Sequence, residues 1–184
     1  MDLLPFDELN RLENGLSIYF ENGKIRDKEA YYDIIDEMLD LFLLAYARGV
    51  EDANIQLGAD VRRTADDAKQ TVDEEVAGKT WRERMRDYYE QGGDISDIVR
   101  IAETETHRDF AQAAFDAAKA AGATMKTWHT MMDDKVRDTH SYLEGVTIPI
   151  DDEFHSYKGG TTLMPGQWGI PEEDCRCRCW LTFS

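Results

Sequence analysis

The chain has 184 residues, enough for one compact domain or two small ones with a buried core. Its 38 acidic and 21 basic side chains give a formal net charge of −17. A protein that coats duplex DNA carries a basic stripe, so this balance excludes that class and leaves open only a small local DNA contact. Hydrophobic residues make up 42% of the chain, too many for an intrinsically disordered protein.

The sequence predicts a protein of a reducing compartment. Residues 1–9 contain no Lys or Arg, whereas a secretory signal needs a basic start and an apolar run. The longest apolar run, residues 41–47, is far short of the roughly 20 residues that span a bilayer. All three cysteines lie between positions 175 and 179, which is a poor disulfide framework. We therefore expect a cytosolic protein with no membrane partner.

The first third of the chain is predicted to be helical and is the most acidic part. Residues 7–20 are a helix candidate that Asn22-Gly23 closes. Over residues 28–55 apolar side chains recur at spacings of three and four, which predicts one long amphipathic helix. The opposite face of that helix carries the acids Asp33, Asp36, Glu37 and Asp40.

Three further helices are predicted before residue 122. Residues 60–77 are helix-prone but weakly apolar. Thr80 and Glu83 have the spacing of a capping box, and Gly92-Gly93 stops the helix that they begin. Asp94 or Ser96 then caps a long helix that ends near residue 121. The predicted buried face of this helix is rich in alanine, which permits close helix packing: Ile98, Ile101, Ala102, Phe110, Ala113, Ala114 and Ala117.

The predicted secondary structure changes from helices to short strands and loops after Gly122. Short β-prone segments cover residues 124–131, 146–150 and 177–183, a helical turn is expected within 134–143, and long loops fill 151–174. We therefore predict an α+β protein, with a helical region over residues 1–122 and a small α+β domain over residues 123–184.

Two segments of the sequence together resemble a known family. The first is Ile101-Ala102-Glu103-Thr104-Glu105 with the Ala-rich helix after it, and the second runs from Lys126 to Cys177. Their order and gaps resemble those of the phage Mu F-like head morphogenesis proteins, also called minor head or minor capsid proteins, over residues 95–180. The motif residues are Trp128, Asp133, Arg137, His140, Gly145, Phe154, Pro165, Gly166, Cys175, Arg176 and Cys177. Two departures are Asp174, where the family often has Asn, and the additional Cys179.

The cysteines alternate with arginines, so an extended strand would place Cys175, Cys177 and Cys179 on one face. Neighbours at i and i+2 in a strand lie too far apart for a favourable disulfide. Small buried hydrophobes are the expected role. A metal or redox role stays open, because thiolates with His140 or His155 could hold a tetrahedral zinc ion. No cofactor is otherwise predicted.

Two groups of polar residues have competing interpretations. Arg137 and His140 share a face of the predicted turn, and they either brace it against the cysteine strand or form a ligand or acid–base pair; we favour the brace. Arg176 is expected to pair with an acid such as Asp133. The only basic concentration is interleaved with acids, which favours a salt-bridged surface over a DNA contact: Arg62, Arg63, Lys69, Arg82, Arg84 and Arg86.

The resemblance implies a non-enzymatic protein of the virion interior that assembles in the host cytoplasm. Its implied partners are the portal or major capsid protein, with a possible contact to packaged DNA, and the helical region is the candidate contact. One alternative is a metal-dependent hydrolase or a transferase that uses Asp133, Arg137, His140 and the cysteines. Another is an acidic adaptor or a DNA-mimic inhibitor, which would need acids spread over one exposed face.

Overall fold

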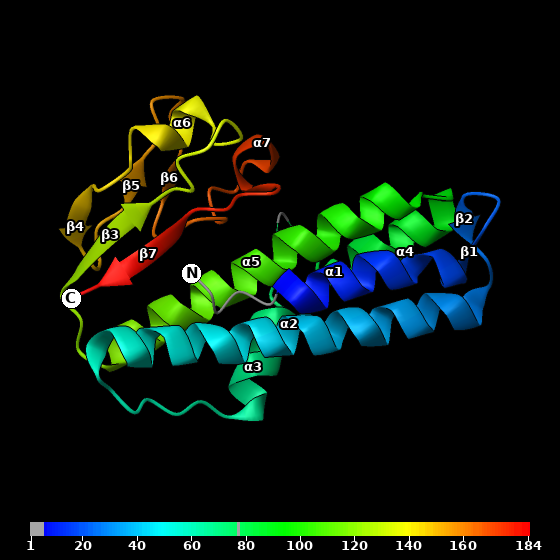
Figure 1. Ribbon diagram of the computed structural model, residues 1–184, viewed down its shortest axis with the longest axis horizontal. Helices are drawn as coiled ribbons and strands as arrows, with labels where there is room; N and C mark the ends of the chain where they lie inside the picture. The colour runs from blue at the N-terminus through cyan, green and yellow to red at the C-terminus, as the bar shows by residue number, and fades with distance from the viewer. Residues whose placement is uncertain (1–5, 77) are drawn as a thin grey trace.

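The computed structural model describes residues 6–76 and 78–184 (Figure 1). Two long helices, α2 (Lys28–Leu57) and α5 (Ile95–Ala120), lie side by side along the molecule. Helices α1 (Phe6–Gly15), α3 (Ala65–Val72) and α4 (Trp81–Gln91) pack around this pair. Within the described residues, no helix is both long and apolar enough to cross a membrane.

The predicted helix over residues 28–55 is confirmed and extends to Leu57. Asp27 Oδ1 accepts a hydrogen bond from the backbone N–H of Ala30 at 2.8 Å, which satisfies one of the free donors at the start of the helix. Gly58 ends it with φ of 62°, a conformation that costs glycine little.

The capping signals in the following segments are also confirmed. Thr80 and Glu83 form a reciprocal capping box at the start of α4, and Gly92 ends that helix in the left-handed conformation. Asp94, rather than Ser96, caps α5. Residues 60–77 are helical only over α3, which begins with a second capping box at Thr64 and Asp67.

The helix expected over residues 7–20 is shorter than predicted. Helix α1 ends at Gly15, a 3₁₀ turn follows over Leu16–Tyr19, and β1 (Phe20–Glu21) then pairs with β2 (Lys24–Ile25). The turn between these strands uses Asn22 and Gly23, both with positive φ, as a tight hairpin requires.

A glycine sets how closely the two long helices approach. A Cβ at Gly49 of α2 would lie 2.3 Å from the carbonyl oxygen of Phe110 and 3.0 Å from the Cβ of Ala113. The predicted alanine-rich face of α5 is therefore the face that packs here, and Ala113, Ala114 and Ala117 are buried.

We expect Gly49→Ala to destabilise the protein by about 1–3 kcal/mol, because the added methyl group meets backbone atoms that cannot move independently. Gly15→Ala is the matched control: φ there is −77° and no atom lies within 4 Å of the new Cβ, so alanine should be neutral or stabilising. Urea unfolding of both variants measures the difference. Equal stability of the two variants would show that the helices separate at little cost.

The C-terminal part contains a three-stranded antiparallel sheet in the order β4-β3-β7, made of Thr147–Pro149, Met125–His129 and Trp180–Phe183. It lies over the C-terminal halves of α2 and α5 (Figure 1). The C-terminal part also contains a hairpin of β5 (Phe154–His155) and β6 (Thr161–Thr162). Two short helices complete this part, α6 (Asp138–Ser141) and α7 (Pro171–Asp174). The α+β class is confirmed.

The strand expected over residues 177–183 begins only at Trp180, so the prediction that all three cysteines lie on one face of a strand is wrong. Cys175 follows α7, and Arg176 adopts a left-handed conformation with φ of 56°. This turn breaks the strand geometry in which cysteines and arginines would point to opposite faces. Cys177 and Cys179 are buried, whereas Cys175 is partly exposed.

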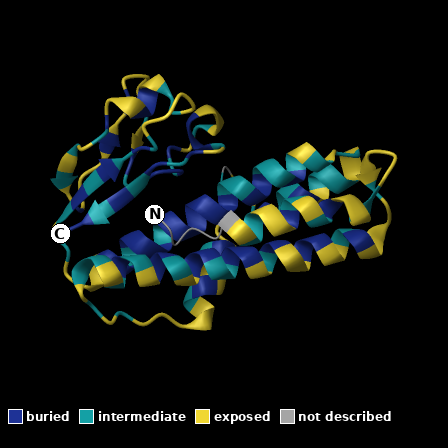
Figure 2. Cartoon of the chain, viewed as in Figure 1, coloured by how far each residue is buried: buried dark blue, intermediate teal, exposed yellow. Residues whose placement is uncertain are grey.

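Buried residues run along both long helices and through the sheet (Figure 2). One hydrophobic cluster joins α1, α4 and the N-terminal halves of α2 and α5. A second cluster joins Tyr46, Val50 and Ala117 of the long helices to Trp128 and Leu181 of the sheet. The boundary near residue 122 stays a prediction, and the second cluster crosses it.

Candidate functional site

Residues far apart in the sequence meet around the side chain of His140. Trp128 comes from β3, His140 from α6, and Cys177 and Cys179 from the extended segment before β7. The imidazole Nδ1 lies 3.8 Å from Cys177 Sγ and 3.5 Å from Cys179 Sγ. All three side chains are buried, and their ligand-type atoms lie within 4.8 Å of one another. Cys175, also a candidate ligand from the sequence, is outside this cluster.

Glu173 lies beside the second ring nitrogen of His140, the one that faces away from the thiols. Its Oε2 lies 3.1 Å from His140 Nε2 and accepts a hydrogen bond from the Thr139 hydroxyl at 2.5 Å. Lys158 Nζ lies 3.7 Å from the second carboxylate oxygen. Glu173 is only 2% exposed, so these contacts compensate for the burial of its charge. Sequence reasoning missed Glu173, because it has no fixed spacing from His140.

Aromatic rings enclose the cluster. The His140 ring stacks on Trp168 with centroids 5.7 Å apart, and Trp128 meets it edge-on at 5.7 Å. Phe154 packs against Trp128 at 5.0 Å, which is the packing expected for the core of a small domain. Lys126 Nζ lies 5.3 Å from the Phe154 ring centre, and burial lowers its pKa to about 8.

Cys177 and Cys179 share a hydrogen bond that shifts the pKa values of the two thiols in opposite directions. The bond to Cys179, followed by the contact with His140, lowers the pKa of Cys177 well below its ordinary value despite burial. The same bond and burial raise the pKa of Cys179. The pair therefore releases its first proton far more readily than its second.

The structure supports the brace predicted for Arg137 and His140. The Arg137 guanidinium donates to the carbonyl oxygen of Cys175, and His140 contacts the thiols of Cys177 and Cys179. Both side chains therefore connect α6 to residues 175–179, the cysteine segment.

Arg176 pairs with an acid, as expected, but the acid is Glu103 rather than Asp133. Arg178 forms the pair with Asp133, with two contacts of 2.7 Å to its carboxylate. Arg176 instead donates to Glu103 of α5 at 2.6 Å. The left-handed conformation at Arg176 directs the two arginines to different elements.

The remaining motif residues shape the loops. Gly145 has φ of 73° and donates its N–H to the carbonyl of Trp128 at 2.9 Å. Pro165 is buried, and Gly166 has φ of 81°, where an added Cβ would lie 3.0 Å from His107 Nδ1. Asp174 accepts the N–H of Trp168 at 2.7 Å and of Ile170 at 3.1 Å, which holds the loop before α7.

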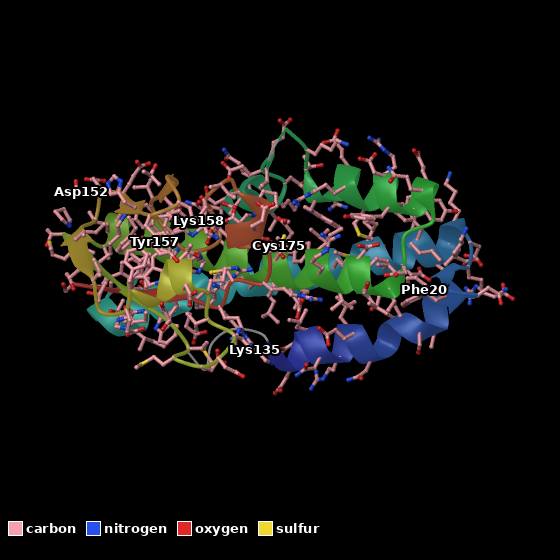
Figure 3. The ribbon with its side chains drawn as sticks, turned by 90° about the horizontal axis from the view of Figure 1, so that it is seen from above. Phe20, Lys135, Asp152, Tyr157, Lys158 and Cys175 are labelled. Atoms are coloured by element: carbon pink, nitrogen blue, oxygen red, sulfur yellow. The ribbon has the colours of Figure 1, made fainter. Side chains whose placement is uncertain are left out.

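A cavity of about 640 Å³ opens between α1, α5 and the cysteine segment. Four basic side chains line it, Lys135, Arg137, Arg176 and Arg178, together with two acidic ones, Glu13 and Glu103. Cys177 reaches its wall. Figure 3 shows Lys135 beside α1 and Cys175 near α5. Two of these bases are paired, Arg176 with Glu103 and Arg178 with Asp133, so the cavity is only weakly basic.

Two buried polar features were missed from the sequence. His107 is 7% exposed, with its Nε2 lying 2.6 Å from the carbonyl oxygen of Cys179. Glu105, Arg108 and Asp109 form a buried charged group on one side of α5. An ordinary helical sequence carries many such charges, and only the packing of α3 and α4 shows which ones are buried.

Four of the six basic residues in the predicted salt-bridged group, Arg62, Arg82, Arg84 and Arg86, pair with acids. Arg62 pairs with Asp60 at 3.0 Å, Arg82 with Asp73 at 3.1 Å, and Arg84 with Glu105 at 2.6 Å. These pairs reduce the positive charge that is free to meet a nucleic acid.

Comparisons with known proteins find a phage head protein and an enzyme among the relatives. The minor head protein GP7 of Bacillus phage SPP1 is 33% identical over 85 residues, which are 45% of this chain and 28% of that protein. The NAD(+)--arginine ADP-ribosyltransferase EFV of Enterococcus faecalis (strain ATCC 700802 / V583) is 34% identical over 85 residues, 44% of this chain and 17% of that protein. The chain thus matches less than a third of the length of either relative. No solved structure matches.

The family comparison covers more of the chain than the motifs do. The family described as Phage Mu protein F like protein matches residues 61–182. This range starts in the loop before α3, earlier than the expected residue 95, and ends in β7. Because the match covers well over half of the sequence, the chain belongs to the phage Mu protein F-like family.

Proposed function

We propose that the chain is a minor head protein that acts in phage head morphogenesis. The family match over residues 61–182 carries this proposal, and the similarity to a minor head protein supports it. The proposed place of action is the virion interior, reached during assembly in the host cytoplasm.

We propose a non-enzymatic role for the family segment. A minor head protein and an ADP-ribosyltransferase are each similar to this chain over 85 residues. That similarity covers only 17% of the transferase, so the name of that enzyme describes a protein with much sequence outside it. The family match over residues 61–182 is the observation that favours a role in the head over the transfer reaction.

The proposed partner surface is the exposed acidic face of α2, which lies outside the family match. Asp33, Asp36 and Asp40 are exposed there and spaced along one side of the helix. A face of this charge favours a basic protein surface over DNA and would speed association with it. The portal or major capsid protein is the proposed partner, and a contact with packaged DNA would have to come from the cavity side.

Co-expression with the portal and major capsid proteins of the same phage tests this function. We expect the chain to co-purify with one of them in size exclusion with mass detection. Asp33→Lys/Asp36→Lys/Asp40→Lys should weaken the complex at least tenfold. The matched control Asp152→Lys/Glu153→Lys/Glu172→Lys changes the same charge at exposed residues of the C-terminal part and should bind normally.

The outcomes separate the surface from the function. Equal weakening by both triple variants would reject the acidic face of α2 as the contact but keep the head role. No complex of the unaltered chain with either protein, and none with assembled heads, would contradict the head role itself.

A further inference from the structure

We propose that His140, Cys177 and Cys179 form a binding site for a thiophilic divalent cation, with zinc as the ion whose ligand preferences fit best. The site would tie α6 to the segment before β7. It goes beyond the head-assembly role and does not depend on it.

The two distances from His140 to the thiols match those of a tetrahedral zinc centre. Zinc lies about 2.3 Å from a thiolate sulfur and about 2.0–2.1 Å from an imidazole nitrogen. Tetrahedral angles then place sulfur and nitrogen about 3.6 Å apart. The two separations from His140 Nδ1 are 3.8 Å to Cys177 and 3.5 Å to Cys179, so an ion could enter with little rearrangement.

Glu173 has the position of a carboxylate that orients a metal-bound histidine. It lies 3.1 Å from His140 Nε2, the ring nitrogen opposite the thiols. His140 Nε2 makes no hydrogen bond among the described residues, so the contact with Glu173 is electrostatic. A proton on Nε2 would leave the Nδ1 lone pair for the cluster. Thr139 and Lys158 fix the carboxylate in turn, so the site has both ligands and an outer layer of contacts.

The cluster is buried among aromatic rings, a setting that disfavours two thiolates unless a cation joins them. The indole Nε1 atoms of Trp128 and Trp168 are buried and have no oxygen or nitrogen partner. Two thiolates and a neutral imidazole balance the charge of a divalent ion, which removes the cost of burying either alone.

The fourth position of the ion faces no cysteine, because Cys175 lies outside the cluster. The described residues therefore supply three ligands, and a water molecule would take the fourth position. Three protein ligands with one open position distinguish this site from a closed four-cysteine site.

Cobalt and zinc titrations of the reduced full-length chain test the proposal. We expect one zinc per chain by elemental analysis, and with Co²⁺ an absorption band near the ultraviolet that is typical of thiolate coordination. Binding should release protons, measured by calorimetry in buffers of different ionisation enthalpy, because the thiols must ionise. The unaltered chain needs no substitution, so misfolding cannot obscure this result.

Variants then assign the ligands. Cys177→Ser and Cys179→Ser should each weaken zinc binding at least 100-fold, whereas the matched control Cys175→Ser should bind as the unaltered chain does. Glu173→Gln should weaken binding about 10–100-fold through the orientation of His140. Absence of the cobalt band and of stoichiometric zinc in the reduced chain would overturn the proposal, as would loss of binding in Cys175→Ser alone.

Discussion

Trp128→Ala is expected to lower the free energy of unfolding by about 3–5 kcal/mol, the usual range for removing a large aromatic side chain from a core. Trp128 is fully buried, and its ring meets His140, Phe154 and Trp168. Its backbone also pairs with Val146 and Gly145. The substitution would leave a cavity between β3, α6 and the loop before α7, where the family motif residues converge.

Chemical denaturation followed by circular dichroism measures this loss. Trp180→Ala is the matched control, because Trp180 is only partly buried and stacks on His129 at the edge of the sheet. Trp180→Ala should lower the free energy of unfolding clearly less than Trp128→Ala does. Trp128→Phe should recover much of the stability, since a smaller aromatic ring refills part of the space. A cost for Trp128→Ala no larger than that for Trp180→Ala would show that the motif residues do not form the core of the C-terminal part.

The helices could be predicted from the sequence because their signals are local. The capping box of Thr80 and Glu83, the stop at Gly92 and the cap at Asp94 each depend on residues within four positions of one another. The alanine face of α5 was likewise visible as a periodic pattern, although its partner glycine at position 49 was not. Helix ends and faces follow from such short-range rules.

The candidate site could be predicted only in part. The motif order pointed to His140 and Cys177. The left-handed conformation of Arg176 breaks the expected strand, and Arg178 rather than Arg176 contacts Asp133. The contact of Glu173 with His140 spans a loop whose path depends on tertiary packing. Local patterns carry no information on such contacts, so Glu173 and the burial of His107 were found only in the structure.

The buried charges of α5 make a second strong prediction. Arg108 is 3% exposed and contacts Glu105 at 3.0 Å and Asp109 at 2.9 Å. It also donates to the carbonyl of Thr71 at 3.2 Å, at the end of α3. Glu105 has a second partner, Arg84. Removing Arg108 therefore leaves Asp109 as the carboxylate without a cation.

We expect Arg108→Met to destabilise the protein by about 3–5 kcal/mol near pH 7, because an uncompensated buried charge costs far more than an exposed one. Burial already raises the pKa of Asp109 well above its ordinary value, and the attraction of Arg108 partly opposes this. Without Arg108 the pKa should rise further. Urea unfolding of the variant and the unaltered chain at pH 5, 6, 7 and 8 measures the cost.

The cost should depend on pH with a definite sign. A carboxyl whose pKa is higher in the folded than in the unfolded state binds its proton more tightly when folded, so stability falls as the pH rises through that range. The deficit of Arg108→Met should therefore be greatest at pH 7–8 and shrink toward pH 5. The matched variant Arg108→Met/Asp109→Asn keeps the Arg84–Glu105 pair but has no carboxyl at position 109. It should show a smaller deficit that hardly changes with pH. A deficit that is the same at every pH in both variants would mean that Arg108 stabilises the helices by packing alone, because the charge of Asp109 would then have no part in it.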